Sequence, residues 1–150
     1  MTAQQKASLQ KVMTDEMNHY NALFTGGKAA LGTEKYPDAN AGLAAVNDPN
    51  SGASRFSRWR QDSKAEQDVS YIDTIKQVEA MYTNNHRPDT VDTWRDDQPL
   101  MGDALNSWVS VAVDWQISSK SDADLAAAEA KFHASARTVQ ADITKIVAES

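Results

Sequence analysis

Glu16 and His19 form a Glu-x-x-His pair, the spacing that supplies carboxylate and imidazole ligands in di-metal helical bundles. Such a site needs a second pair, but Glu129 and His133 are four residues apart instead of three. The helix expected over residues 99–118 contains no Glu. We therefore expect no bound metal or other cofactor, and keep Glu16 and His19 as the weaker metal-site alternative. A metal- or haem-binding bundle with a redox or storage role is the alternative function, with His19, His86 or His133 as haem ligands.

A basic and aromatic cluster occupies residues 55–60, which read Arg-Phe-Ser-Arg-Trp-Arg. The guanidinium group of arginine can donate two parallel hydrogen bonds to a carboxylate or phosphate, so the cluster could hold an anionic ligand. In the alternative interpretation these arginines pair with surface acids such as Asp96 or Asp97. The chain contains neither a nucleophile elbow nor a complete P-loop. The sequence therefore indicates no enzyme class.

Length, charge and composition limit the classes of protein that the chain can belong to. Its 150 residues fit one domain, residues 1–150, with a full hydrophobic core. The formal net charge of −6 argues against nucleic acid as a partner, because such binding needs a basic face. No cysteine is present, which excludes disulfides and thiolate metal sites. No run of 18 apolar residues occurs, so no transmembrane segment is expected.

Helical periodicity accounts for most of the chain. We expect four long helices over residues 2–25, 54–83, 99–118 and 122–148. Gly26-Gly27 is the expected stop of the first, Ser54 the N-cap of the second, and Pro99 the first residue of the third. Ser121 and Asp124 resemble a capping box before the fourth.

Two connections separate these helices before the tight turn after Ser118. The first, residues 32–53, is long for a compact domain, and its alanine-rich part at 38–46 is expected to form a short helix that caps one end of the molecule. The second, residues 84–98, is expected to contain one or two helical turns at 90–97. Together these features predict an all-α fold, an antiparallel up-down-up-down four-helix bundle with a long first connection containing a short helix.

The most apolar stretch, residues 100–117, should be the most buried helix. Its stripe consists of Met101, Leu105, Trp108, Ala112 and Trp115, at helical spacing. The last helix has a matching stripe that includes Phe132 and Val139. We expect Leu105, Trp108, Phe132 and Val139 to be among the most buried side chains.

A polar break interrupts the apolar face of the second long helix, where Arg60, Ser63 or Lys64, and Gln67 follow the inward line. Glu16 lies near the centre of the apolar face of the first helix. If the two helices are antiparallel, these breaks should lie at similar heights. The polar groups then either form a structural Glu16–Arg60 network or line a ligand pocket, because burying them unpaired is costly. The candidate ligand-binding residues are Glu16, Tyr20, Arg60, Ser63 and Gln67.

The favoured function is a non-enzymatic helical bundle that binds a small molecule or a protein partner. An enzyme with its site in the polar break is the remaining alternative. Scarce Lys and Glu beside abundant Ala, Asp, Asn, Ser and Thr favour an extracytoplasmic or secreted setting, such as a sensor-like or lipoprotein ectodomain, with a cytoplasmic one left open. The sequence leaves the oligomeric state open.

Overall fold

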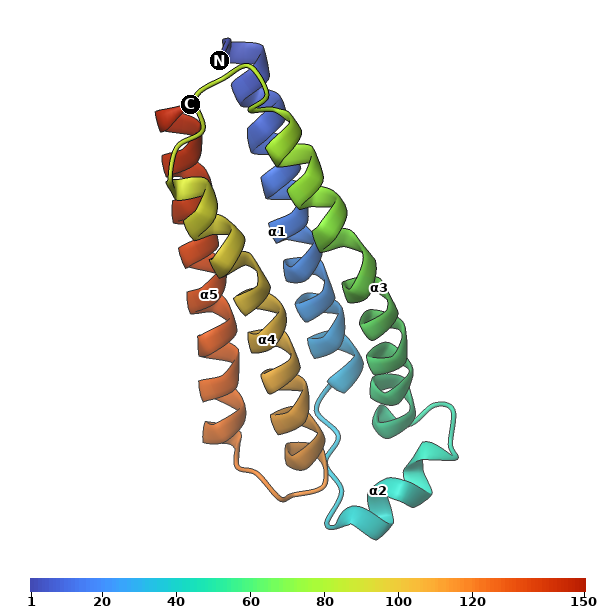
Figure 1. Cartoon of the computed structure of the whole chain (residues 1–150). Helices are drawn as coiled ribbons and strands as arrows, with labels where there is room; N and C mark the ends of the chain where they lie inside the picture. The colour runs from blue at the N-terminus through green and yellow to red at the C-terminus, as the bar shows by residue number, and fades with distance from the viewer.

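The computed structural model is entirely helical, without strands in the chain that it describes (Figure 1). It describes residues 1–150, except for the side chains of residues 68–70. Four long helices lie side by side, and successive ones run in opposite directions (Figure 1). They are α1 (Ala3–Leu31), α3 (Gly52–Ala80), α4 (Thr90–Gln116) and α5 (Asp122–Glu149), and the short α2 (Ala39–Val46) crosses one end. The predicted all-α, bundle-like fold is confirmed.

Both chain ends lie at the end of the bundle opposite α2 (Figure 1). The Met1 ammonium group donates a hydrogen bond to the Ser150 carbonyl oxygen at 3.0 Å. The side-chain oxygens of Tyr82 and Ser150 are 2.8 Å apart, which ties the end of α5 to the segment after α3. Among the described residues, no helix combines the length and the apolar character needed to span a membrane.

The expected stop of the first helix at Gly26-Gly27 is wrong. α1 continues to Leu31 and ends at Gly32, whose φ of 58° suits glycine. Gly27 serves packing instead, because a Cβ there would lie 2.6 Å from Trp59 Cζ2 and 2.9 Å from Trp108 Cζ3. The glycine lets two tryptophans approach the α1 backbone, and the cost of glycine within a helix is offset by this contact.

The expected helix start at Pro99 is also wrong, because α4 begins at Thr90 and contains Pro99 in its interior. Proline has no N–H, so the carbonyl of Arg95, one turn earlier, loses its normal intrahelical donor. The Tyr71 hydroxyl of α3 donates a hydrogen bond to this Arg95 oxygen. A neighbouring helix thus satisfies the acceptor that proline leaves free, and the turns expected at residues 90–97 join the main helix.

Other helix ends agree more closely with their capping residues. Asp38 caps α2 by accepting from the Ala41 amide at 2.8 Å. The Ser121–Asp124 capping box forms as expected at the start of α5. The N-cap of α3 is Ser51 instead of Ser54, and its hydroxyl accepts from the Ser54 amide at 3.0 Å. The helix therefore begins three residues earlier than the Ser54 assignment implied.

The core is densest where α4 packs on α5, the most extensive helix pair in the protein. Leu105, Trp108, Phe132 and Val139 are almost completely buried, as predicted. Phe24 of α1 stacks on Phe132, with ring centroids 4.4 Å apart, and meets Trp108 edge to face at 4.9 Å. Large apolar side chains thus fill the space between α1, α4 and α5.

Candidate functional site

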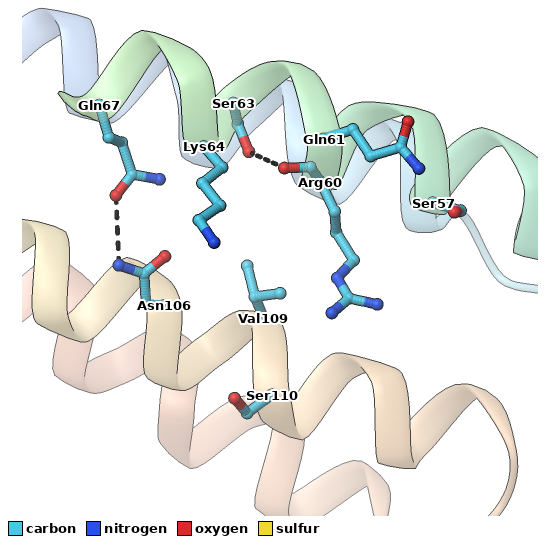
Figure 2. A pocket seen from close by; sticks show the side chains of 9 residues that line it. All are labelled: Ser57, Arg60, Gln61, Ser63, Lys64, Gln67, Asn106, Val109 and Ser110. Carbon is cyan, nitrogen blue, oxygen red and sulfur yellow. Dashed lines mark hydrogen bonds between the residues drawn. The ribbon is translucent and has the colours of Figure 1, made fainter. Parts of the chain in front are cut away.

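A polar cleft of about 540 Å³ separates α3 from α4. Figure 2 shows the side chains of both helices turned into the gap between them. We call this site the α3/α4 cleft; its lining residues are Ser57, Arg60, Gln61, Ser63, Lys64 and Gln67 of α3, with Asn106, Val109 and Ser110 of α4. α3 packs mainly on α1 and only lightly on α4, which leaves room for the cleft.

The cleft stays open because of the side chains that the two helices present to each other. Arg60, Lys64 and Gln67 are long and polar, and Asn106 and Ser110 opposite them are also polar. Closing the helices over these groups would strip water from charges and amides without supplying enough partners. The arrangement therefore keeps the polar groups hydrated and available to a ligand.

Two hydrogen bonds order the α3 side of the cleft. The Asn106 side-chain amide donates to Gln67 Oε1 at 3.2 Å and bridges the two helices at one end of the cleft (Figure 2). Ser63 is buried, and its hydroxyl donates to the Arg60 carbonyl oxygen at 3.2 Å, within its own helix. Gln67 and Ser63 therefore shape the cleft, while the side-chain donors of Arg60 and Lys64 have no hydrogen-bond partner among the described residues.

Arg60 and Lys64 give the cleft its charge. They lie one turn apart on α3, and both side chains extend toward α4 (Figure 2). Neither forms an ion pair with any described residue. In contrast, Arg55 lies 3.5 Å from Glu34, and Arg58 donates to the Pro49 carbonyl oxygen at 3.2 Å. The basic cluster thus divides into two arginines with partners in the loop and one that faces the cleft.

Glu16 and Tyr20 lie elsewhere, in the interior of the bundle. Glu16 is 4% exposed and accepts a hydrogen bond from the Thr74 hydroxyl at 3.1 Å. Thr74 lies about 20 Å beyond Arg60 along α3, from the rise per residue of a helix. Tyr20 packs on Gly102, where a Cβ would lie 3.3 Å from its ring. The structure therefore brings Arg60, Ser63 and Gln67 together in the cleft lining, which includes neither Glu16 nor Tyr20.

Glu16 and Arg60 lie at different positions along the bundle because α1 is longer than expected. The prediction measured the position of Glu16 from a helix end at Gly26-Gly27, but α1 continues through Leu31. Gly27 lies against Trp59, which precedes Arg60 in the chain. The expected Glu16–Arg60 network is therefore not formed, and Glu16 contacts the second half of α3.

Metal-ligating side chains do not gather in the part of the chain that the structure describes. No three His, Cys, Asp or Glu residues are close enough there to hold a metal ion. His19 packs edge to face on Tyr20, with ring centroids 5.8 Å apart. His133 lies 3.5 Å from Glu129, which also binds Lys28 at 2.6 Å. These histidines are engaged with aromatic or charged neighbours.

The α4 side of the cleft was not among the residues predicted from the sequence. Asn106 and Ser110 are four residues apart and share a helix face, but they fall on the side of the helix opposite the apolar stripe. Their spacing was the signal that could have found them. The separation between α3 and α4, which makes that face one wall of the cleft, cannot be predicted from the local sequence.

Comparison with protein-family models, curated proteins and solved structures gives no match for this chain. The function is therefore inferred from the geometry of the cleft.

Proposed function

We propose that the protein is a non-enzymatic binding domain whose α3/α4 cleft takes a small anion bearing a carboxylate or phosphate group. The observation that carries the proposal is the pair Arg60 and Lys64, which face the cleft without an acidic partner among the described residues. In a chain of net charge −6, carboxylates are plentiful, yet none of those whose side chains the structure describes forms an ion pair with these two cations. A ligand carboxylate or phosphate supplies the missing charge.

The donor set suits a planar or tetrahedral oxyanion. The Arg60 guanidinium offers parallel N–H groups to two oxygens, and Lys64 adds a mobile point charge one turn away. Ser110 and Ser57 place hydroxyls on the same walls. Because both cations are exposed to solvent, we expect an affinity of about millimolar to high micromolar that weakens as salt is added.

The test is a titration with inorganic phosphate and with acetate, followed by amide chemical shifts and calorimetry at constant ionic strength. Arg60→Met and Lys64→Met should each weaken anion binding at least about fivefold without changing the fold, as one lost charge-assisted contact implies. Arg137→Met and Lys76→Met are matched controls, because they remove exposed cations outside the cleft. Equal loss in the controls, or no binding in the parent protein, would overturn the proposal.

We also propose an extracytoplasmic setting. Its support is the composition, poor in Lys and Glu, together with the adjacent chain ends at the side of the bundle away from α2 and the cleft. That arrangement lets the domain be attached at one end while the cleft lies in the half of the bundle nearer α2. Fractionation of the native host, with the protein found only in the cytoplasmic fraction, would contradict this setting.

A further inference from the structure

A second hollow, of about 350 Å³, lies at the end of the bundle where α2 crosses α3 and α4. Its walls are mostly apolar and include Leu43 and Val46 of α2, Phe56 of α3, and Val113 and Ile117 at the end of α4. We call it the α2 groove. Leu43 is 69% exposed and Val46 is 44% exposed, so large apolar side chains at its rim remain in contact with water.

The α2 groove and the α3/α4 cleft are adjacent, because Arg60 and Ser57 line both. Lys64 lines only the cleft, so the groove itself contains a single formal positive charge. An apolar wall interrupted by a few polar groups is the usual composition of a small-molecule site. A monoanion with an apolar chain matches both the charge and the lining.

Gln116 adds an independent observation. It lines the α2 groove and is 6% exposed, and its side-chain Nε2 is buried without a hydrogen-bond partner among the described residues. A buried donor without an acceptor costs free energy, and a ligand oxygen would remove that cost. A carboxylate has two oxygens, so one can accept from Arg60 while the other accepts from Gln116.

Resting on the proposed function, we propose that the ligand is an aliphatic monocarboxylate. Its carboxylate binds between Arg60 and Gln116, and its alkyl chain lies in the α2 groove against Phe56, Leu43 and Val46. Burial of the chain removes apolar surface of both ligand and groove from water. Binding then tightens with chain length, which a purely electrostatic anion site does not show.

The experiment compares acetate, butanoate and octanoate, each below micelle-forming concentration and at equal ionic strength, by calorimetry and amide chemical shifts. Six added methylenes should make octanoate bind at least about thirtyfold tighter than acetate, allowing for partial burial of each methylene. Leu43→Ser combined with Val46→Ser should abolish most of that gain and leave acetate binding unchanged. Both residues are exposed, so the variant should fold normally.

Leu100→Ser is the matched control, because Leu100 is 51% exposed on α4 and lies outside the groove. It should keep the full dependence on chain length. If every carboxylate binds with equal affinity and Arg60→Met weakens all of them, the alkyl-chain site is wrong and the anion cleft stands. If octanoate binds tightly but neither Arg60→Met nor the α2 variant weakens it, the chain binds elsewhere and the inference fails. If no anion binds, the proposed function fails as well.

Discussion

α4 meets α5 and α3 in opposite ways. Against α5 it forms an extensive contact with an apolar centre, where Leu105 and Trp108 pack near Phe132 and Val139. Against α3 it leaves a hydrated cleft lined by polar and charged side chains. One helix thus has a sealed side that stabilises the fold and an open side that is available for binding.

The difference shows how side-chain chemistry decides helix separation in a bundle. Apolar side chains draw helices together because each buried methylene lowers the free energy of folding. Long cations and amides hold helices apart because their desolvation costs more than partial pairing returns. The open side is bounded by specific links at the end away from α2, through Gln67 with Asn106 and through the Tyr71–Arg95 bond.

Removing Phe132 should damage the sealed side most. Phe132→Ala should lower the free energy of unfolding by about 3–5 kcal/mol, because it removes a ring that stacks on Phe24 and leaves a cavity. Chemical denaturation measures the loss. Leu100→Ala, at an exposed site of the same bundle, is the control and should cost less than about 1 kcal/mol. A loss under about 1 kcal/mol for Phe132→Ala would show that α5 is not packed as described.

Adding a methyl group beside Trp59 and Trp108 should have the next largest effect on the free energy of unfolding. Gly27→Ala forces a methyl group against Trp59 and Trp108 and should cost about 1–3 kcal/mol. Gly26→Ala is the matched control, since its Cβ would lie at an ordinary 3.4 Å from Trp59 Nε1. That variant should be neutral or up to about 1 kcal/mol more stable, because alanine favours helix. Equal effects at both glycines would remove the packing role of Gly27.

The hydrogen bond from Tyr71 to the Arg95 carbonyl oxygen links α3 to α4 beyond the end of the cleft, and its contribution to stability can be measured. Tyr71→Phe should cost about 1 kcal/mol, because the Arg95 carbonyl then lacks both a helical donor and the hydroxyl. Pro99→Ala restores an N–H to that carbonyl, so Tyr71→Phe should cost much less in the Pro99→Ala background. A double-mutant cycle measured by thermal unfolding gives the coupling. Independent, additive effects would refute the link between the tyrosine and the proline.

A smaller effect concerns Asp142, a carboxyl on the sealed side next to Asp97. Burial and the neighbouring Asp97 raise the pKa of Asp142 from 3.8 to about 7. The folded protein therefore holds this proton more tightly than the unfolded chain. The protonated Asp142 carboxyl therefore adds to the free energy of unfolding below about pH 4. This contribution is lost as the pH rises through about 7.

Asp142→Asn removes this pH dependence. At pH 8 the variant should be more stable than the parent protein by less than about 1 kcal/mol, since solvent screens the partly exposed carboxyl. At pH 4 the difference should nearly vanish. Urea denaturation at both pH values measures the two differences. The same difference at both pH values would show that Asp142 titrates normally.

Much of the fold could be predicted because helical periodicity and capping residues are local signals. The buried stripe around Trp108 and the capping box at Ser121 follow directly from spacing. Gly27 and Pro99 do not end or begin a helix as their residue types suggest, because contacts with Trp59 and Tyr71, which are distant in sequence, outweigh these local tendencies. Tertiary packing of this kind leaves little trace in a short sequence window.

The candidate site was predicted only in part, for a related reason. Arg60 and Gln67 stood out because they interrupt an apolar line, and both line the cleft. The prediction that Glu16 lies level with Arg60 and Gln67 depends on where α1 ends, because the position of Glu16 along the bundle is counted from that end. Asn106 and Gln116 gain their positions from the separation of α3 and α4 and from the placement of α2, neither of which the local sequence encodes.

The most direct test of the account is to locate bound octanoate by amide chemical shifts. The account predicts shifts in residues 57–67 of α3, in residues 106–117 at and just after the end of α4, and in α2, with the amides of α5 around Phe132 and Val139 unchanged. At a subsaturating octanoate concentration, Arg60→Met should reduce these shifts, and Arg137→Met should preserve them. Shifts concentrated along α5, or a pattern unaffected by Arg60→Met, would contradict the claim that the open side of α4 is the binding side.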